Sequence, residues 1–381
     1  MTRRVKFMIF FIGTLILVLA SVGVLYKTLT GYATLGIFSK LTVLTLLVLS
    51  WFAPIWLRFM QKRPDIISGA VYDIAYKLGY FMMGFVLILT MLIIARDILW
   101  YVLYFISGKK ALFNPDIAHN INVANIVALI LALLISFYGV WQAHKTPVVQ
   151  NIRIQDVRLT SPLKFVIASD FHINHATPKW HIQKMINAVN AQNPDYILLV
   201  GDIADDEPEK AVDKIKMLSA LKAKKIFISL GNHEYYHKPY AWMIEFAKLG
   251  FEILQNSGSR IENSNVYVAG VPDAHSASVN YKNAFSNAQD EYKILISHTP
   301  ADFNELDKTL FDIQFSGHTH GGQIFPFQFI TKKANNGYLA GLYEKDGAKL
   351  FVMRGAGYWG PPMRIFAEPD IAVLTLEPSS K

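Results

Sequence analysis

The first 147 residues consist of long apolar runs separated by short polar connections. Each run approaches the roughly 20 apolar residues that a helix needs to span a bilayer. The third run contains Arg96 and Asp97, which we expect at a membrane interface or paired inside a helical bundle, because an ionised side chain is costly in lipid. The pattern predicts an all-α transmembrane domain over residues 1–146, with four spans at about Phe7–Tyr26, Leu41–Phe59, Leu78–Phe105 and Ile121–Trp141.

From residue 147 onward the apolar runs are short enough for buried strands and too short for helices. Amphipathic helical patterns occur between the first of them, at about Trp180–Ala191, Lys210–Leu221 and Tyr240–Leu249. Alternating strands and helices are typical of an α/β domain, which we place at residues 147–381. The five runs that matter most are Phe165–Ser169, Tyr196–Val200, Ile226–Leu230, Ile294–Ser297 and Ile313–Ser316.

Composition and charge divide the chain at the same place. The hydrophobic fraction of 52% and mean hydropathy of +0.26 are too high for one soluble body of 381 residues. Residues 1–147 hold 13 basic and 4 acidic residues, a balance of +9, whereas residues 148–381 hold 24 and 25, a balance of −1. The net charge of +8 therefore belongs to the membrane domain, and it gives no support to nucleic-acid binding, which would need a basic face on the folded domain.

Basic residues between the spans predict the orientation. They concentrate before the first span, between the second and third, and after the fourth, so the positive-inside rule places both ends of the bundle and the second domain in the cytoplasm. The chain is thus predicted to be a multi-pass protein of the inner or plasma membrane. A rival interpretation makes the first segment a signal peptide, with Arg3 and Arg4 before an apolar stretch. Three further spans argue against export, and the absence of cysteine is compatible with either compartment.

Polar clusters that can bind metal follow the five short runs. In α/β sheets, ligand sites lie beyond the carboxyl ends of the strands, so clusters far apart in sequence can meet. Two divalent cations about 3.5–4 Å apart can bind the attacking and leaving oxygens of a displacement at phosphorus and lower the pKa of a bound water. Carboxylate, imidazole and amide ligands suit Mn, Fe, Zn or Mg. The predicted ligands are Asp170, His172, Asp202, Asn232, His298, His318 and His320, and Asp202 after Gly201 is the best candidate for a bridging carboxylate.

The acidic stretch from Asp205 to Glu209 permits two interpretations. It follows the predicted bridging carboxylate and could form a third cation site. However, acidic residues before the helical pattern at Lys210 are also favourable at a helix N-terminus, where the helix dipole is positive. We favour the helix start.

The clusters resemble the successive motifs of the calcineurin-like metallophosphoesterases, in that family's chain order. The motifs are Asp170-Phe-His172, Gly201-Asp202, Gly231-Asn-His-Glu234, Ser297-His298 and Gly317-His-Thr-His-Gly-Gly-Gln323. The last motif, with Arg354-Gly-Ala-Gly and Pro361-Pro-Met-Arg364, is similar to the membrane-associated branch of the YkuE and YaeI type. The resemblance covers about residues 148–377. It implies a four-layer fold in which two mixed β-sheets are flanked by helices.

The resemblance also implies roles for individual residues. Asp170, His172, Asp202 and His320 would bind the first ion, and Asp202, Asn232, His298 and His318 the second. His233 would contact the phosphate and assist the leaving group rather than bind metal. Glu234 stands where many members of the family have Asp, so its supporting contact to His233 is in doubt. Arg354 and Arg364 are expected to contact the substrate.

These features predict a membrane-anchored, metal-dependent hydrolase of phosphodiester or pyrophosphate bonds. Relatives with this ending include enzymes that cleave the pyrophosphate of UDP-2,3-diacylglucosamine, so the resemblance implies a lipid-linked substrate. The alternatives are a non-catalytic receptor or scaffold, and a transporter with a regulatory phosphoesterase-like domain. After the Gly317–Gln323 motif, Ile324–Ile330 is an apolar run with a proline inside it. We expect a core strand starting after Pro326, or alternatively an apolar lip made by Phe325 and Phe327 beside the metals.

Overall fold

The computed structural model describes residues 3–31, 34–63, 69–109 and 117–379. The chain divides into two compact units. The helical unit comprises Met1–Val140 and the short segment Gly360–Met363. The other comprises Trp141–Trp359 and Arg364–Lys381, and we call it the catalytic unit after the activity that the sequence predicts. The sequence boundary at residues 146/147 stays a prediction, and part of the predicted Lys109–Asn114 connection lies outside the described residues.

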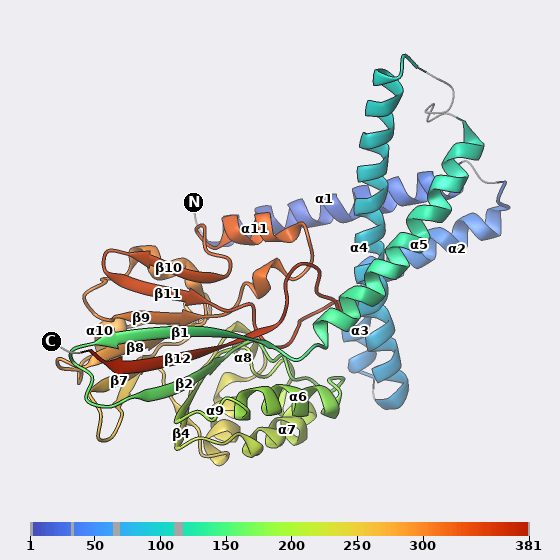
Figure 1. Cartoon of the computed structure of the whole chain (residues 1–381). Helices are drawn as coiled ribbons and strands as arrows, with labels where there is room; N and C mark the ends of the chain where they lie inside the picture. The colour runs from blue at the N-terminus through green and yellow to red at the C-terminus, as the bar shows by residue number, and fades with distance from the viewer. Residues whose placement is uncertain (1–2, 32–33, 64–68, 110–116, 380–381) are drawn as a thin grey trace. The chain divides into compact units, whose positions relative to one another are not determined.

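The helical unit contains helices long and apolar enough to cross a membrane (Figure 1). Among the described residues, three pass this test singly, and a fourth crossing results if α2 and α3 together form one span. Those two helices are bent by 73°, because Pro54 near the start of α3 has no N–H to donate to the preceding turn. The second predicted span therefore falls on a broken helix pair. The bounds are α1 Arg3–Thr30, α2 Ile37–Trp51, α3 Ala53–Gln61, α4 Gly69–Ile106 and α5 Ala118–Ala143.

Polar side chains of the helical unit pair with one another inside the bundle. Ser21 Oγ lies 2.7 Å from Thr90 Oγ1 and accepts a hydrogen bond of 3.0 Å from Trp51 Nε1. Arg96 forms an ion pair of 2.6 Å with Asp97 and also donates to Asn125. Arg96 and Asp97 thus pair with each other, and the Asp97 side chain is 42% exposed. Large apolar side chains on these helices are instead widely exposed, as expected for a surface that faces lipid.

Two six-stranded mixed sheets form the catalytic unit (Figure 1). The first has the order β1-β12-β2-β3-β4-β5 and the second β10-β11-β9-β8-β7-β6. β2, β3 and β4 run parallel, as do β7, β8 and β9. The bounds are β1 Val148–Asp156, β2 Leu163–Ala168, β3 Tyr196–Val200, β4 Lys225–Ser229, β5 Glu252–Ile253, β6 Ser257–Arg260, β7 Val266–Gly270, β8 Tyr292–Ile296, β9 Ile313–Ser316, β10 Gly341–Lys345, β11 Ala348–Val352 and β12 Asp370–Pro378.

Alternation of apolar side chains along the strands produces three cores. Phe165 and Leu198 of the first sheet pack with Ile294 and Phe315 of the second in the core between the sheets. A second core lies between the first sheet and the helices α6 Lys179–Asn190, α7 Pro208–Ile215 and α9 Pro239–Lys248. A third covers the other face of the second sheet. The predicted four-layer α/β fold is confirmed.

Short helices lie in the connections of the catalytic unit. They are α8 Asn232–Tyr236, α10 Tyr281–Ala284, the 3-10 helices η2 Lys216–Ala220, η3 Pro300–Glu305 and η4 His320–Gly322, and α11 Phe327–Ala334. The prediction of a core strand after Pro326 is wrong, because that segment is α11 and none of its eight residues is buried. The proline ends the preceding loop and cannot donate to a sheet ladder, so the apolar run continues as a surface helix.

Candidate metal centre

The predicted ligands sit in the turns that directly follow strands. Five of them, Asp170, His172, Asp202, His318 and His320, have positive φ angles between 47° and 70°. This left-handed conformation is unfavourable for residues with a Cβ and persists where the surrounding structure imposes it. The turns aim carboxylates and imidazoles from both sheets at one place.

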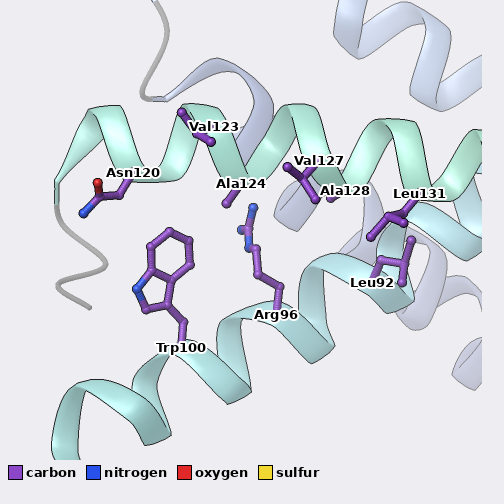
Figure 2. Close-up of a pocket in the computed structure, with 9 residues that line it drawn as sticks. All are labelled: Leu92, Arg96, Trp100, Asn120, Val123, Ala124, Val127, Ala128 and Leu131. Carbon is purple, nitrogen blue, oxygen red and sulfur yellow. The ribbon is translucent and has the colours of Figure 1, made fainter. Parts of the chain in front are cut away.

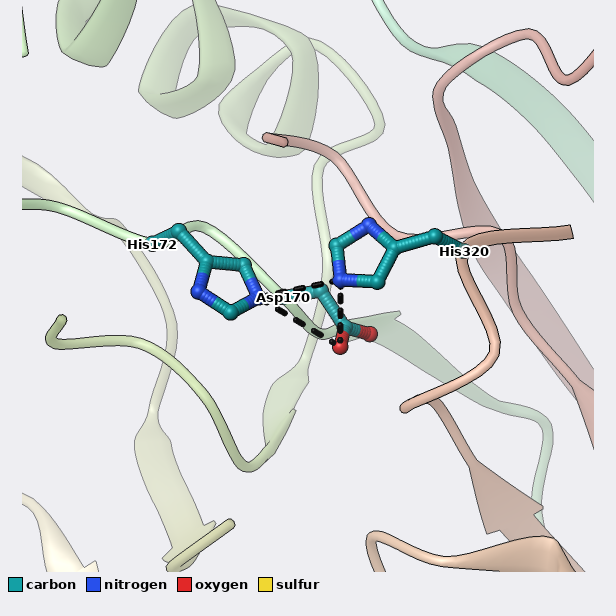
Figure 3. A group of neighbouring side chains, drawn as sticks. All are labelled: Asp170, His172 and His320. Carbon is teal, nitrogen blue, oxygen red and sulfur yellow. Dashed lines mark hydrogen bonds and ion pairs between the residues drawn. The ribbon is translucent and has the colours of Figure 1, made fainter. Parts of the chain in front are cut away.

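Asp170, His172 and His320 form the first group of potential ligands (Figure 3). His172 Nε2 and His320 Nε2 are 3.0 Å apart, and Asp170 Oδ1 lies 3.9 Å from the former and 3.4 Å from the latter. All three side chains are buried. Two nitrogens and a carboxylate oxygen therefore converge in the absence of solvent.

Asp202, His298 and His318 form the second group. His298 Nε2 lies 3.0 Å from Asp202 Oδ2, and His318 Nδ1 lies 2.9 Å from Asn232 Oδ1. The structure thus brings Asn232 to this group, as the family resemblance implied.

One oxygen of Asp202 lies between the two groups. Asp202 Oδ2 is 3.7 Å from His172 Nε2 of the first group and 3.0 Å from His298 Nε2 of the second. Its other oxygen accepts a 2.8 Å hydrogen bond from the backbone N–H of His233, which fixes the carboxylate. Burial by itself raises the pKa of Asp202, but the neighbouring histidines outweigh burial and hold this pKa well below its usual range. This position is the one that a bridging ligand requires.

The donor set fits divalent cations. His298 Nδ1 is 2.8 Å from the carbonyl oxygen of Val200, so its N–H donates there and the lone pair of Nε2 is left for the centre. Buried Nε2 faces the Asp202 carboxylate, 3.0 Å from Oδ2. Burial lowers the pKa of His318 to about 4 and that of His320 well below its usual range, so both rings are neutral at neutral pH, the form that can bind a metal.

Close backbone approach at the centre depends on glycines. Gly201 has a φ of 73°, and a Cβ there would lie 2.6 Å from His298 Nδ1. A Cβ on Gly355 would lie 2.5 Å from that of Asp170. The Arg354-Gly-Ala-Gly motif therefore wraps the first ligand, which explains glycine at that position.

His233 is held by a carboxylate that the sequence analysis assigned elsewhere. Its Nδ1 is hydrogen-bonded to Asp205, and its Nε2 lies 4.0 Å from Asp202 Oδ2, facing the centre. Burial lowers the pKa of His233, but the charges of Asp205 and Asp202 outweigh this effect and raise the pKa to about 9. Asp205 also lies 3.3 Å from His172 Nδ1. Asp205, His172 and His233 together form a third group that could hold an ion.

The acidic stretch thus serves two purposes. α7 begins at Pro208 after Glu207, so the predicted helix start holds for the later residues. Asp205 instead joins the site. The spacing of three residues between Asp202 and Asp205 was the sequence signal that could have assigned it.

Glu234 supports the backbone and not His233. Its carboxylate accepts hydrogen bonds from the backbone N–H groups of Asp202, Ala204 and Gly231, at 3.0, 2.7 and 2.8 Å. Burial, followed by repulsion from Asp202, raises the pKa of Glu234 to about 7. The glutamate therefore ties the turn after β3 to the turn after β4.

The two predicted substrate arginines have different surroundings. Arg354 is partly exposed and its Nη1 forms a 3.0 Å ion pair with buried Asp370. Arg364 is fully buried, and burial lowers its pKa to about 10. Its guanidinium donates to backbone carbonyls in the segments that follow β9 and β11, including those of Gly357 at 2.6 Å and His320 at 3.3 Å. Arg364 thus has no exposed atom to offer a substrate, and it braces the ligand loop.

An apolar patch lies just beyond the last ligand loop. We define the aromatic lip as Phe325, Phe329, Ile330 and Phe366, whose exposed fractions are 44, 68, 58 and 76%. The ring of Phe325 contacts those of Phe329 and Phe366 at centroid distances of 6.2 and 5.7 Å. Phe327 is partly buried. Phe325 therefore belongs to an exposed lip, of which Phe327 is not a part.

Comparisons with known proteins agree with this geometry. Residues 163–322 match the family model of the calcineurin-like phosphoesterases. The chain is 30% identical to an uncharacterized metallophosphoesterase of Campylobacter jejuni, over 97% of this chain and 99% of that one. It is 27% identical to a transmembrane protein with a metallophosphoesterase domain from Danio rerio, over 66% of this chain and 62% of the relative. Uncharacterized metallophosphoesterase YkuE of Bacillus subtilis is 30% identical over 56% of this chain and 79% of its own length.

Proposed function

Because this chain belongs to the calcineurin-like metallophosphoesterase family, we propose that it is a membrane-anchored hydrolase that uses two divalent ions to cleave phosphodiester or pyrophosphate bonds. The observation that carries the proposal is the position of Asp202 Oδ2, 3.7 Å from His172 Nε2 and 3.0 Å from His298 Nε2. A carboxylate between two groups of imidazoles is what a two-ion centre needs.

Each ion would have its own ligands besides the shared carboxylate. Asp170, His172 and His320 would hold one ion, and Asn232, His298 and His318 the other. When bound, the ions would neutralise charge at phosphorus and activate water for attack. The family normally binds divalent metals, and Mn, Fe, Zn or Mg suits these oxygen and nitrogen donors.

His233 would supply the proton for the leaving oxygen. Its raised pKa, about 9, keeps the ring protonated near neutral pH. Asp205 holds Nδ1 and thereby directs Nε2 to the centre. In this scheme Asp205 acts as a positioning residue, and Glu234 and Arg364 keep the ligand loops in place.

A metal-reconstituted activity screen tests the proposed reaction. Full-length protein would be purified in detergent, stripped of metal, and assayed with each of Mn, Fe, Zn and Mg on bis-p-nitrophenyl phosphate, nucleotide diesters and lipid pyrophosphates. We expect metal-dependent hydrolysis in wild type that is lost in Asp202→Asn. Equal background rates in both proteins would overturn the proposal.

The aromatic lip supports a lipid-linked substrate. Exposed apolar patches on a folded domain usually mark a binding surface. α11 has exposed Phe329 and Ile330 together with Lys332 and Lys333 in its last turn, which is the composition of a helix that lies on an anionic bilayer. The lip begins five residues after His320, so an acyl chain held there would belong to a lipid whose phosphate reaches the ions.

A comparison of two substrates tests the lip. Phe325→Ser with Phe329→Ser should reduce hydrolysis of a lipid pyrophosphate much more than hydrolysis of bis-p-nitrophenyl phosphate. Leu342→Ser, at an exposed position on β10 of the same unit, is the matched control. Equal loss on both substrates with a lowered melting temperature would show that these phenylalanines only stabilise the fold.

We also propose that the catalytic unit faces the cytoplasm, on the basis of the positive-inside count. A reporter active only in the cytoplasm should work when fused after Lys381. One active only outside should work when inserted in the Lys109–Asn114 connection. The opposite pattern would favour an exported enzyme.

A further inference from the structure

The helical unit contains a groove between α4 and α5 that takes no part in the proposed reaction (Figure 2). Its volume is about 490 Å³, within the range of roughly 300–1,000 Å³ that is usual for sites that bind small molecules. Its lining residues are Leu92, Arg96, Trp100, Asn120, Val123, Ala124, Val127, Ala128 and Leu131.

Polarity changes along the groove. Trp100 and Asn120 lie at one end, Leu92 and Leu131 at the other, and Arg96 reaches across from α4 between them (Figure 2). Trp100 lies near the end of α4 and Asn120 near the start of α5, so the polar end is the one toward the membrane interface. Tryptophan is enriched at that level of the bilayer. The apolar end lies deeper.

Hydrogen bonds hold the guanidinium of Arg96 in place but do not use all of its N–H groups. Its Nε and Nη2 donate to Asp97 Oδ1 at 2.9 and 2.6 Å, and its Nη1 donates to Asn125 Oδ1. Asn125 is oriented in turn by a 2.8 Å hydrogen bond from its Nδ2 to the carbonyl of Thr28. A guanidinium has five N–H groups, so one on each terminal nitrogen has no partner among the described residues.

We infer that this groove binds one phospholipid from the bilayer. The spare N–H groups of Arg96 would bind the lipid phosphate, since a guanidinium matches phosphate oxygens with two parallel hydrogen bonds. Trp100 and Asn120 border the headgroup. An acyl chain runs between α4 and α5 along Val127 and Leu131. An ionisable residue within a membrane-spanning segment commonly marks a functional site.

The polarity of the groove selects this occupant. A free anion would bind Arg96 but leave the apolar end of the groove unoccupied. A hydrocarbon without a headgroup would leave the Arg96 donors unpaired in a medium without water. A phospholipid satisfies both ends.

Native mass spectrometry of the full-length protein tests the inference. Protein delipidated in mild detergent would be titrated with phosphatidylglycerol, phosphatidylethanolamine or inorganic phosphate. We expect wild type to bind one phospholipid tightly. Arg96→Gln should weaken that binding about tenfold or more, the scale of a hydrogen bond to a charged group. Arg58→Gln, an exposed arginine on α3, should bind as wild type does.

A second variant keeps the test valid if Arg96→Gln does not fold. Ala124→Leu fills the groove and leaves Arg96 and its partners unchanged, so it should also lose the tight lipid. Ala95→Leu, on the exposed side of α4 and absent from the lining, is the matched control. Binding that Ala124→Leu leaves unchanged, or saturation of the site by inorganic phosphate alone, would overturn the inference. Because none of these variants touches the metal ligands, failure here leaves the proposed hydrolase function unaffected.

Discussion

Buried polar groups are used in opposite ways in the helical and catalytic units. In the helical unit they satisfy one another, as Ser21, Thr90 and Trp51 do in a chain of hydrogen bonds. In the catalytic unit they converge at the strand ends, where Asp202 Oδ2 lies 3.7 Å from His172 Nε2 and 3.0 Å from His298 Nε2. The first arrangement specifies how helices pack, whereas the second holds donor atoms ready for ions. We therefore expect substitutions of the paired polar groups in the helical unit to change stability, and substitutions of the convergent groups at the strand ends to change metal binding and rate.

The largest effect is expected at the shared carboxylate. Asp202→Asn should reduce the occupancy of both ion sites and lower phosphodiesterase activity by more than about 10²-fold. Removing a residue that only hydrogen-bonds to a metal ligand already costs up to about 10²-fold, and Asp202 would bind the ions directly. The fold should remain, because asparagine has nearly the same shape. Metal analysis, circular dichroism and turnover of bis-p-nitrophenyl phosphate measure the three properties. Near-wild-type turnover would show that Asp202 does not bridge.

The next effect separates an acid from a ligand. His233→Ala should retain about two metals per chain and lose about 10²-fold in turnover, which is typical for a positioned acid or base. His318→Ala, by contrast, should lose metal. If His233→Ala loses as much metal as His318→Ala, His233 is a metal ligand and not the acid.

A third experiment concerns a buried histidine that is not a predicted ligand. Burial lowers the pKa of His181 from 6.5 to about 3. Because the unfolded chain binds a proton at higher pH, the neutral ring contributes fully to stability above about pH 6.5, and this contribution declines as the pH falls toward 3. His181→Leu should remove about 2 kcal/mol of the stability difference between pH 7 and pH 5. Urea unfolding of wild type and His181→Leu at pH 7 and pH 5 measures the two free-energy differences. Added metal should change neither difference. If the stability difference between pH 7 and pH 5 is the same in His181→Leu as in wild type, the pKa of His181 is not lowered by folding.

The smallest effect is expected in the helical unit. Ser21→Ala leaves the N–H of Trp51 without its acceptor and should lower stability by about 1 kcal/mol, since hydrogen bonds between membrane helices are weak. Activity should be unchanged. Ser107→Ala is the control, because that hydroxyl donates to the carbonyl of Tyr104 within its own turn. Loss of activity without loss of stability in Ser21→Ala would break the comparison.

Local signals made much of the catalytic unit predictable. The five apolar runs match strands to within about two residues at each end, as expected from assignment differences at strand ends. The predicted ligands follow such runs, so parallel strands within each sheet, together with the packing of the two sheets, bring them to one place. Arg364 was harder, because nothing in its local sequence indicates that its guanidinium lies among backbone carbonyls.

The remaining errors have tertiary causes. Asp205 was assigned to a helix start because that signal lies in the neighbouring sequence. Its hydrogen-bond partner, His233, follows β4 and is 28 residues away in the chain. The segment after Pro326 reads as a strand by composition, yet it packs on the surface as α11. In the helical unit, hydropathy predicts the positions of the long helices, but the 73° bend between α2 and α3 depends on one proline.

The pairing of β1 with β12 affects how the protein is made. β1 directly follows the last helix and β12 separates it from β2, so the first strand of the catalytic unit has no sheet to join until residues 370–378 have left the ribosome. The helices can insert during translation, while the first sheet closes only near its end. A chain stalled or truncated before Asp370 would expose the edge of β2, with its row of unpaired backbone groups, to other chains at the membrane. Nascent-chain aggregation and proteolytic clearance should therefore rise sharply for truncations before this strand.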